Sequence, residues 1–138
     1  MTVEQLIYDR LLANSTISGI VGTRVFHDYD QSPEDPNAAP TAFIVFGLER
    51  ESESEDVTKT RSWFVAEYSV ACVAPTAENK VALANAVKAE MKALRGTTGD
   101  LVIKDSILRD NSDQTEEALI AAGLRMRVVF QEVWWVNT

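Results

Sequence analysis

The chain has 138 residues, of which 46% are hydrophobic and 25% are charged, and it carries a net charge of −8. This length and composition suit one domain with a buried core and exclude a wholly disordered chain. The apolar runs are short, and the start lacks the basic and apolar stretches of a secretory signal. We therefore expect no membrane span and a soluble protein kept in the cytoplasm unless assembly carries it out.

The negative charge is concentrated in residues 27–56. These hold nine acidic residues against one arginine, while the remainder of the chain holds 12 of each sign. Such a field repels phosphate. Specific binding of duplex nucleic acid through this region is therefore not expected, and no basic stripe elsewhere replaces it.

The first elements are predicted from capping and apolar spacing. Thr2 and Gln5 form a capping box, and apolar residues follow at helical spacing over residues 3–13. Residues 17–21 favour one further helical turn. Residues 23–26 favour a short strand.

A loop and a hairpin are predicted next. Three prolines exclude a regular helix or strand interior between residues 27 and 40. Residues 41–48 are apolar on both faces, and residues 62–73 alternate with apolar even positions, which predicts the two strands of an antiparallel hairpin. The acidic run between them, residues 49–60, is predicted to be the mobile tip.

The second half of the chain supplies the longest helix and two more strands. Thr76 is the expected N-cap of a helix over residues 76–95, whose apolar stripe predicts that it lies on the sheet. Strands are predicted over residues 101–108 and 124–136. Residues 116–122 are compatible with a helical turn or a loop.

These elements predict one α+β domain over residues 1–138. We expect an antiparallel or mixed sheet of about five strands, with the two main helices, residues 3–13 and 76–95, packed on one face. The other face is then available to partners.

The last strand is predicted to place its two tryptophans on opposite faces. Trp134 shares the parity of Phe130 and is assigned to the core. The face with Trp135 is polar at one end and apolar at the other, and apolar area left in water costs roughly 25 cal/mol per Å². Self-association would cover this face, although another helix could also do so. The predicted interface residues are Arg125, Arg127, Val133, Trp135 and, from an earlier strand, Trp63.

The stretch HDYDQSPEDP, residues 27–36, is the first candidate for a metal site. It combines the only histidine with four carboxylates, Asp28, Asp30, Glu34 and Asp35. A calcium loop counted from Asp28 lacks the required glycine at its sixth position and glutamate at its twelfth, and zinc needs more nitrogen or sulfur ligands. Carboxylates on one proline-broken loop also lack the fixed separation of a glycosidase pair. We predict a solvated loop, with no metal and no cofactor.

Nucleophilic catalysis is also not expected. Cys72 is the only cysteine, so it cannot form an intramolecular disulfide, and it falls on the apolar face of a predicted strand, where a dyad with His27 would need it exposed. The chain has no Gly-x-Ser-x-Gly elbow and no glycine cluster of the kind that cradles phosphate. The sequence therefore predicts a protein that is not an enzyme.

A set of structural motifs spans nearly the whole chain, roughly residues 3–136. They are residues 3–12 (VEQLIYDRLL), 22–26 (GTRVF), 40–46 (PTAFIVF), Trp63 opening a strand, 74–78 (APTAE), 94–96 (LRG) and 132–135 (EVWW). In this order they resemble the tail-terminator, or tail-completion, proteins of long-tailed bacteriophages, which are small α+β domains.

The resemblance implies a structural role in a virion. It implies a hexameric ring at the head-proximal end of the tail, assembled in the host cytoplasm, that stops growth of the tail tube. The implied partners are copies of the chain itself, the tail tube protein and a head-completion or connector protein, with DNA as passing, non-specific cargo. Another neck or tube component of the tail is the alternative, and a small-molecule-binding or hydrolytic domain is the alternative from a different class.

The acidic tip carries its charges in alternation with serines. In an extended hairpin Glu51, Glu53 and Glu55 point the same way. Together with Asp56 they are predicted to form an acidic arm that faces the ring lumen or a partner. In the lumen they would let passing DNA slide, because like charges repel.

Overall fold

The computed structural model describes residues 1–28, 41–55 and 62–138. Within these ranges the helices are α1 (Val3–Ala13), α2 (Ser15–Val21), α3 (Ala77–Lys92) and α4 (Glu117–Ala121). The strands are β1 (Val25–His27), β2 (Phe43–Glu55), β3 (Ser62–Ala74), β4 (Gly96–Thr98), β5 (Leu101–Gln114) and β6 (Arg125–Asn137). The predicted helices and the hairpin are present, but β2 was predicted to end at residue 48 and instead continues to Glu55, into the run assigned to the mobile tip.

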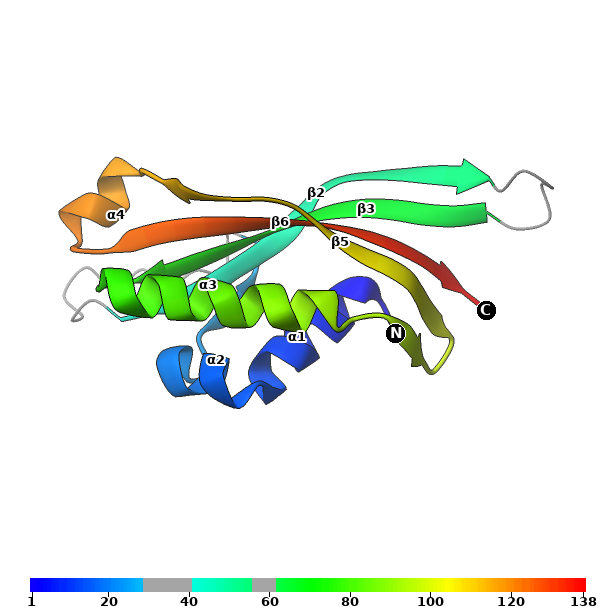
Figure 1. Cartoon of the computed structure of the whole chain (residues 1–138), viewed down its shortest axis with the longest axis horizontal. Coiled ribbons are helices and arrows are strands. Elements are labelled where there is room, and N and C mark those ends of the chain that lie inside the picture. The colour runs from blue at the N-terminus through cyan, green and yellow to red at the C-terminus, as the bar shows by residue number, and fades with distance from the viewer. Residues whose placement is uncertain (29–40, 56–61) are drawn as a thin grey trace.

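The strands form one six-stranded sheet in the order β1-β2-β3-β6-β5-β4. β1 pairs with β2 in parallel and every other pair is antiparallel, so the sheet is mixed. The prediction of about five strands omitted β4, a three-residue strand that pairs with the start of β5. Figure 1 shows α1, α2 and α3 together on one side of the sheet and α4 at one end of it.

The helices begin where side chains can cap them. Thr2 accepts a hydrogen bond from the backbone of Gln5 at 3.1 Å, and Thr76 accepts one from Asn79 at 3.1 Å. Asn14 separates α1 from α2 by capping the second helix, since its side chain accepts from the backbone of Ile17 at 3.1 Å. A residue that reads as an interruption in the sequence is therefore a helix start.

The main core lies between the sheet and the helices α1 to α3. Its sheet residues include the even positions of β3, as predicted, among them Tyr68, Val70 and Cys72. A second, smaller cluster lies on the opposite side of the sheet, towards α4. Its members are Phe43, Val45, Ala71, Val73, Leu124, Met126 and Val128. The sheet is therefore apolar on both sides at that end.

The prediction of which face of β6 is buried against the helices is wrong: the odd-numbered residues, not the even-numbered ones, lie on the helix side. Direct cross-strand partners share a face, and Val133 pairs with Ala66 while Trp135 pairs with Phe64, both on the helix side. Val133 is 0% exposed, and Trp135 packs against the main core. The even residues of β6, which looked like the better apolar face, include members of the second cluster.

A polar link joins α3 to the sheet inside this core. The Ser106 hydroxyl donates to the backbone carbonyl of Met91 at 2.7 Å, and the Gln131 amide donates to the Ser106 oxygen at 3.0 Å. Gln131 is 1% exposed. The helix is thus held to β5 and β6 by directional bonds in addition to apolar packing.

Beyond the helices, β2 and β3 continue as a two-stranded extension. Figure 1 shows it projecting past the helices at the end of the sheet opposite α4. We call this part, from Arg50 to Glu67, the arm; its described residues are 50–55 and 62–67, paired from Arg50–Glu67 to Glu55–Ser62.

Candidate functional site

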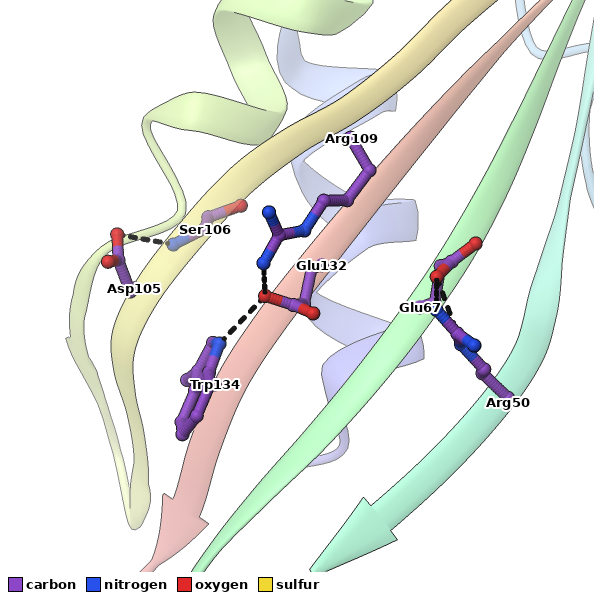
Figure 2. A network of polar contacts seen from close by, with 7 residues as sticks. All are labelled: Arg50, Glu67, Asp105, Ser106, Arg109, Glu132 and Trp134. Carbon is purple, nitrogen blue, oxygen red and sulfur yellow. Dashed lines mark hydrogen bonds and ion pairs between the residues drawn. The ribbon is translucent and has the colours of Figure 1, made fainter. Parts of the chain in front are cut away.

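The side of the sheet opposite α1 to α3 carries a group of charged and aromatic side chains, which we call the open face. They come from four neighbouring strands, β2, β3, β6 and β5, and Figure 2 shows those of them that form hydrogen bonds and ion pairs, which are Arg50, Glu67, Arg109, Glu132 and Trp134. The residues are Arg50, Trp63, Glu67, Lys104, Arg109, Glu132 and Trp134. The helices packed on the main core lie on the other side of the sheet (Figure 1).

Two carboxylates meet in the middle of the open face. Glu67 and Glu132 are directly opposite each other in the register of β3 and β6. Each is neutralised from the flanking strand: Arg50 donates two hydrogen bonds to Glu67, at 2.7 and 3.1 Å, and Arg109 forms an ion pair with Glu132 (Figure 2). Like charges placed opposite each other destabilise a sheet, so the two arginines make this pairing possible.

The carboxylate of Glu132 is also bonded to a tryptophan. The indole nitrogen of Trp134 donates to its Oε2 at 3.0 Å. Burial alone would raise the pKa of Glu132, but the hydrogen bonds from Arg109 and Trp134 outweigh burial and lower it. The group is therefore ionised at neutral pH, and it fixes the orientation of the tryptophan ring.

The arm end of the open face is aromatic. The Lys104 ammonium lies 5.2 Å from the ring centre of Trp63 and 5.8 Å from that of Trp134. At these distances a cation is attracted to both ring faces. Tryptophan is enriched at the energetic centres of protein interfaces, so this pair of tryptophans marks a candidate contact surface.

Three β-bulges deliver charged residues to the open face. The register shifts between Leu48 and Arg50 in β2 and twice in β5, and the residues skipped are Glu49, Lys104 and Arg109. Glu49 accepts a hydrogen bond from the Ser69 hydroxyl at 2.7 Å. Bulges re-aim side chains in this way. Strict alternation from Ile44 and from Leu101 would place Arg50 and Arg109 on the helix side, so the bulges that precede them bring these two arginines to the open face.

The predicted interface residues are not brought together. Trp63 lies on the open face, while Trp135 is stacked on Phe64 with ring centres 4.7 Å apart, and Val133 is buried in the core. The apolar end of the stripe is thus packed against the main core and Phe64.

Arg125 and Arg127 lie at the other end of β6. Arg127 pairs with Cys72 in the register, nine positions along β3 from Trp63, which corresponds to roughly 30 Å of strand. Arg125 is exposed. Arg127 contacts Asp113 at 2.9 Å, and Lys80 contacts the same carboxylate at 2.9 Å.

Asp113 offers a direct test of this charged group. Hydrogen bonds from Arg127 and then Lys80 lower its pKa to about 2, so its stabilising contribution is present above the ordinary pKa and is lost as pH falls through about 2. We expect Arg127→Gln to raise the pKa of Asp113 towards its ordinary value, as followed by NMR titration of the carboxyl carbon. Arg125→Gln is the matched control and should leave it unchanged. An ordinary pKa for Asp113 in the unmodified protein would contradict the geometry.

The acidic residues of the arm are partly described. Glu51 pairs with Ala66 and Glu53 with Phe64, so both point to the helix side, which confirms that they share a direction. Glu55 pairs with Ser62 in the register, and Asp56 lies outside the described residues. The role of this group remains a prediction.

Cys72 and His27, the two residues considered for nucleophilic catalysis, lie in different environments. Burial raises the pKa of the Cys72 thiol to about 12 against the opposing charge of Arg127, and the thiol is fully buried. His27 stacks on Phe46, with ring centres 4.9 Å apart, and lies 3.6 Å from the Asp28 carboxylate. The other acids of that stretch, Asp30, Glu34 and Asp35, lie outside the described residues.

Across residues 1–28, 41–55 and 62–138, no three His, Cys, Asp or Glu side chains are grouped so that they could hold a metal ion. No helix in these ranges is long and apolar enough to cross a membrane.

Comparison with known proteins finds a similarity of fold and none of sequence family. No protein-family model and no curated protein sequence matches the chain. Among solved structures, the fold is similar to that of a chain in the virion of a native gene transfer agent particle, with a TM-score of 0.68 and 18% sequence identity. The match covers 94% of this chain and 90% of that one. At this identity the similarity concerns the fold.

Proposed function

We propose that this chain is a non-enzymatic structural protein of a phage-like virion, and that it forms a hexameric ring that terminates the tail tube. The observation that carries the proposal is the fold shared along nearly the full length with a chain of a virion particle. The resemblance of the sequence motifs to tail-terminator proteins supports the same role. The partners would be other copies of the chain, the tail tube protein and a head-completion protein.

A terminator has to meet different partners on its two sides. The two ends of the sheet differ in chemistry in a way that suits this requirement. One end presents Trp63 and Trp134 under Lys104, and the other presents Arg125 and Arg127. We assign these ends to the two axial neighbours, the tube ring and the head-completion protein. In the set of interface residues, Trp134 replaces Trp135, and the buried Val133 is removed.

The charge of the chain suits a channel that DNA passes through. The net charge of −8 and the acidic arm disfavour phosphate binding, so DNA would be cargo without specific contacts. The arm, with Glu51, Glu53, Glu55 and Asp56, would face the lumen or a partner.

Light scattering after size exclusion and negative-stain electron microscopy test the proposal. We expect closed rings with a mass about six times the 15.3 kDa of the chain. Open tubes of increasing length would instead favour the alternative of a tube component. A compact monomer at every concentration and salt strength would contradict the ring. It would favour the alternative hypothesis of a small-molecule-binding or hydrolytic domain.

A further inference from the structure

We propose that neighbouring copies join edge to edge, with the arm of one copy lying in the groove between α3 and β5 of the next. In this contact Glu51 and Glu53 of the arm face Lys88 and Lys92 of the neighbouring α3. The inference rests on the proposed ring and names its subunit contact.

Both outer edges of the sheet are open along most of their length. β1 pairs only with residues 44–46 of β2, and β4 pairs only with residues 101–103 of β5. Among the described residues, no strand lines the outer edge of β2 from residue 47 to 55 or that of β5 from residue 105 to 114. An open edge presents backbone groups to another strand.

The edge of β5 borders a groove of about 410 Å³ beneath α3. Its walls combine apolar side chains with two lysines, and the residues that matter are Lys88, Ala89, Lys92, Ile107, Leu108 and Gln131. Leu108 is 43% exposed, and the buried Gln131 side chain has an Oε1 atom without a hydrogen-bond partner among the described residues. An exposed leucine and an unsatisfied buried acceptor indicate that this groove is incomplete in the single chain.

The lysines of the groove are available for a partner. The neighbouring cations are already paired, Lys80 with Asp113 and Arg95 with Asp105. Lys88 and Lys92 have no carboxylate partner within the described part of the chain. They therefore present uncompensated positive charge on α3.

β2 presents the complementary set on its helix side, from Leu48 into the arm. Leu48 pairs with Tyr68, Glu51 with Ala66 and Glu53 with Phe64, so these three residues form one row along β2. Leu48 is 41% exposed, and neither glutamate has an ion-pair partner among the described residues. The row contains one exposed leucine and two acids, and the groove contains one exposed leucine and two bases.

The spacing of the charges also matches. Two residues four apart on a helix are separated by about 6 Å along its axis, and two residues two apart on a strand by about 7 Å. Lys88 and Lys92 can therefore face Glu51 and Glu53 in one alignment.

The topology requires two copies for this contact. β2 and β5 lie near opposite edges of one sheet, so the arm cannot reach its own groove. If β2 of one copy continues the sheet at the β5 edge of the next, its helix-side row faces the side on which α3 lies. The two surfaces differ, so the contact is heterologous and repeats around a ring.

Charge reversal and charge exchange test the contact. Glu51→Lys with Glu53→Lys, and separately Lys88→Glu with Lys92→Glu, are expected to weaken association about tenfold or more, because like charges then face each other. Combining all four changes is expected to restore association. Glu116→Lys with Glu117→Lys, at the exposed start of α4, makes the same change of net charge as the Glu51 and Glu53 pair and is expected to have no such effect. The readout is molar mass by light scattering across a concentration series, with circular dichroism to confirm folding.

The outcomes separate this inference from the proposed function. Rings that persist unchanged in both reversed pairs would overturn the arm contact while leaving the ring in place. Loss of rings in both pairs without recovery in the fourfold variant would also overturn it, since direct pairing predicts recovery. A monomeric unmodified protein under all conditions would overturn both the ring and the contact.

Discussion

Trp135→Ala is expected to lower the free energy of unfolding by about 3 kcal/mol, whereas Trp134→Ala is expected to lower it by about 1 kcal/mol or less. The two residues are adjacent and identical in type. They differ because Trp135 packs against the main core and stacks on Phe64, while Trp134 lies on the open face. Urea unfolding followed by circular dichroism gives both values.

The same two variants separate an effect on folding stability from an effect on binding to a partner. If Trp134 contacts the axial partner proposed above, Trp134→Ala should weaken that binding while the fold stays intact, because large aromatic residues dominate the binding energy of interfaces. Equal losses of stability in the two variants, or a larger loss for Trp134→Ala, would show that the faces of β6 have been assigned incorrectly.

Removing both arginines of the open face is expected to cost about 2 kcal/mol at neutral pH. Arg50→Ala with Arg109→Ala leaves Glu67 and Glu132 opposite each other without a counter-charge. Breaking one side of a buried ion pair is strongly destabilising, and the partial exposure of this site reduces the effect. Chemical denaturation at several pH values measures it.

The stability of the unmodified protein and that of the double arginine variant are expected to change in opposite directions as the pH falls. In the unmodified protein the pKa of Glu132 is lowered, so its contribution to stability is present above the ordinary pKa and is lost as pH falls through the lowered value. In the double variant the remaining burial and the facing carboxylate raise this pKa, so acidification should recover stability relative to neutral pH.

A matched control isolates the carboxylates. Adding Glu67→Gln and Glu132→Gln to the double arginine variant should recover most of the lost stability, because the uncompensated charges are removed while the side-chain size is kept. If the fourfold variant is as unstable as the double one, packing by the arginine stems rather than charge holds this face together.

The sequence was a good guide to elements whose signals are local. The caps at Thr2 and Thr76, the hairpin pattern and the apolar stripe of α3 each depend on residues a few positions apart, and all of these elements are present. β4 was missed because three residues carry too little pattern to identify a strand.

Which face of a strand is buried was less predictable. β6 is apolar on both faces in different parts of its length, because one part packs on the main core and another on the cluster near α4. Its side chains could be assigned only after the register with β3 was known. Since Ala66 and Phe64 of β3 lie on the helix side, Val133 and Trp135 follow them.

The candidate site was the least predictable part. Trp63 was identified, but Arg50 and Arg109 lie on the open face only because a bulge earlier in each strand reverses the alternation. The pairing of Glu67 with Glu132 joins residues 65 positions apart in the chain. Neither relation leaves a periodic signal, because both are set by the alignment of one strand with another.

The Ser106–Met91 and Gln131–Ser106 bonds have a mechanical consequence. Apolar packing has no directional bonds, whereas moving α3 along the sheet would break the buried bond between the Ser106 hydroxyl and the Met91 carbonyl. The helix and the strands beneath it therefore shift as one body. A pull on α3 would therefore pass into β5 and β6 without slippage.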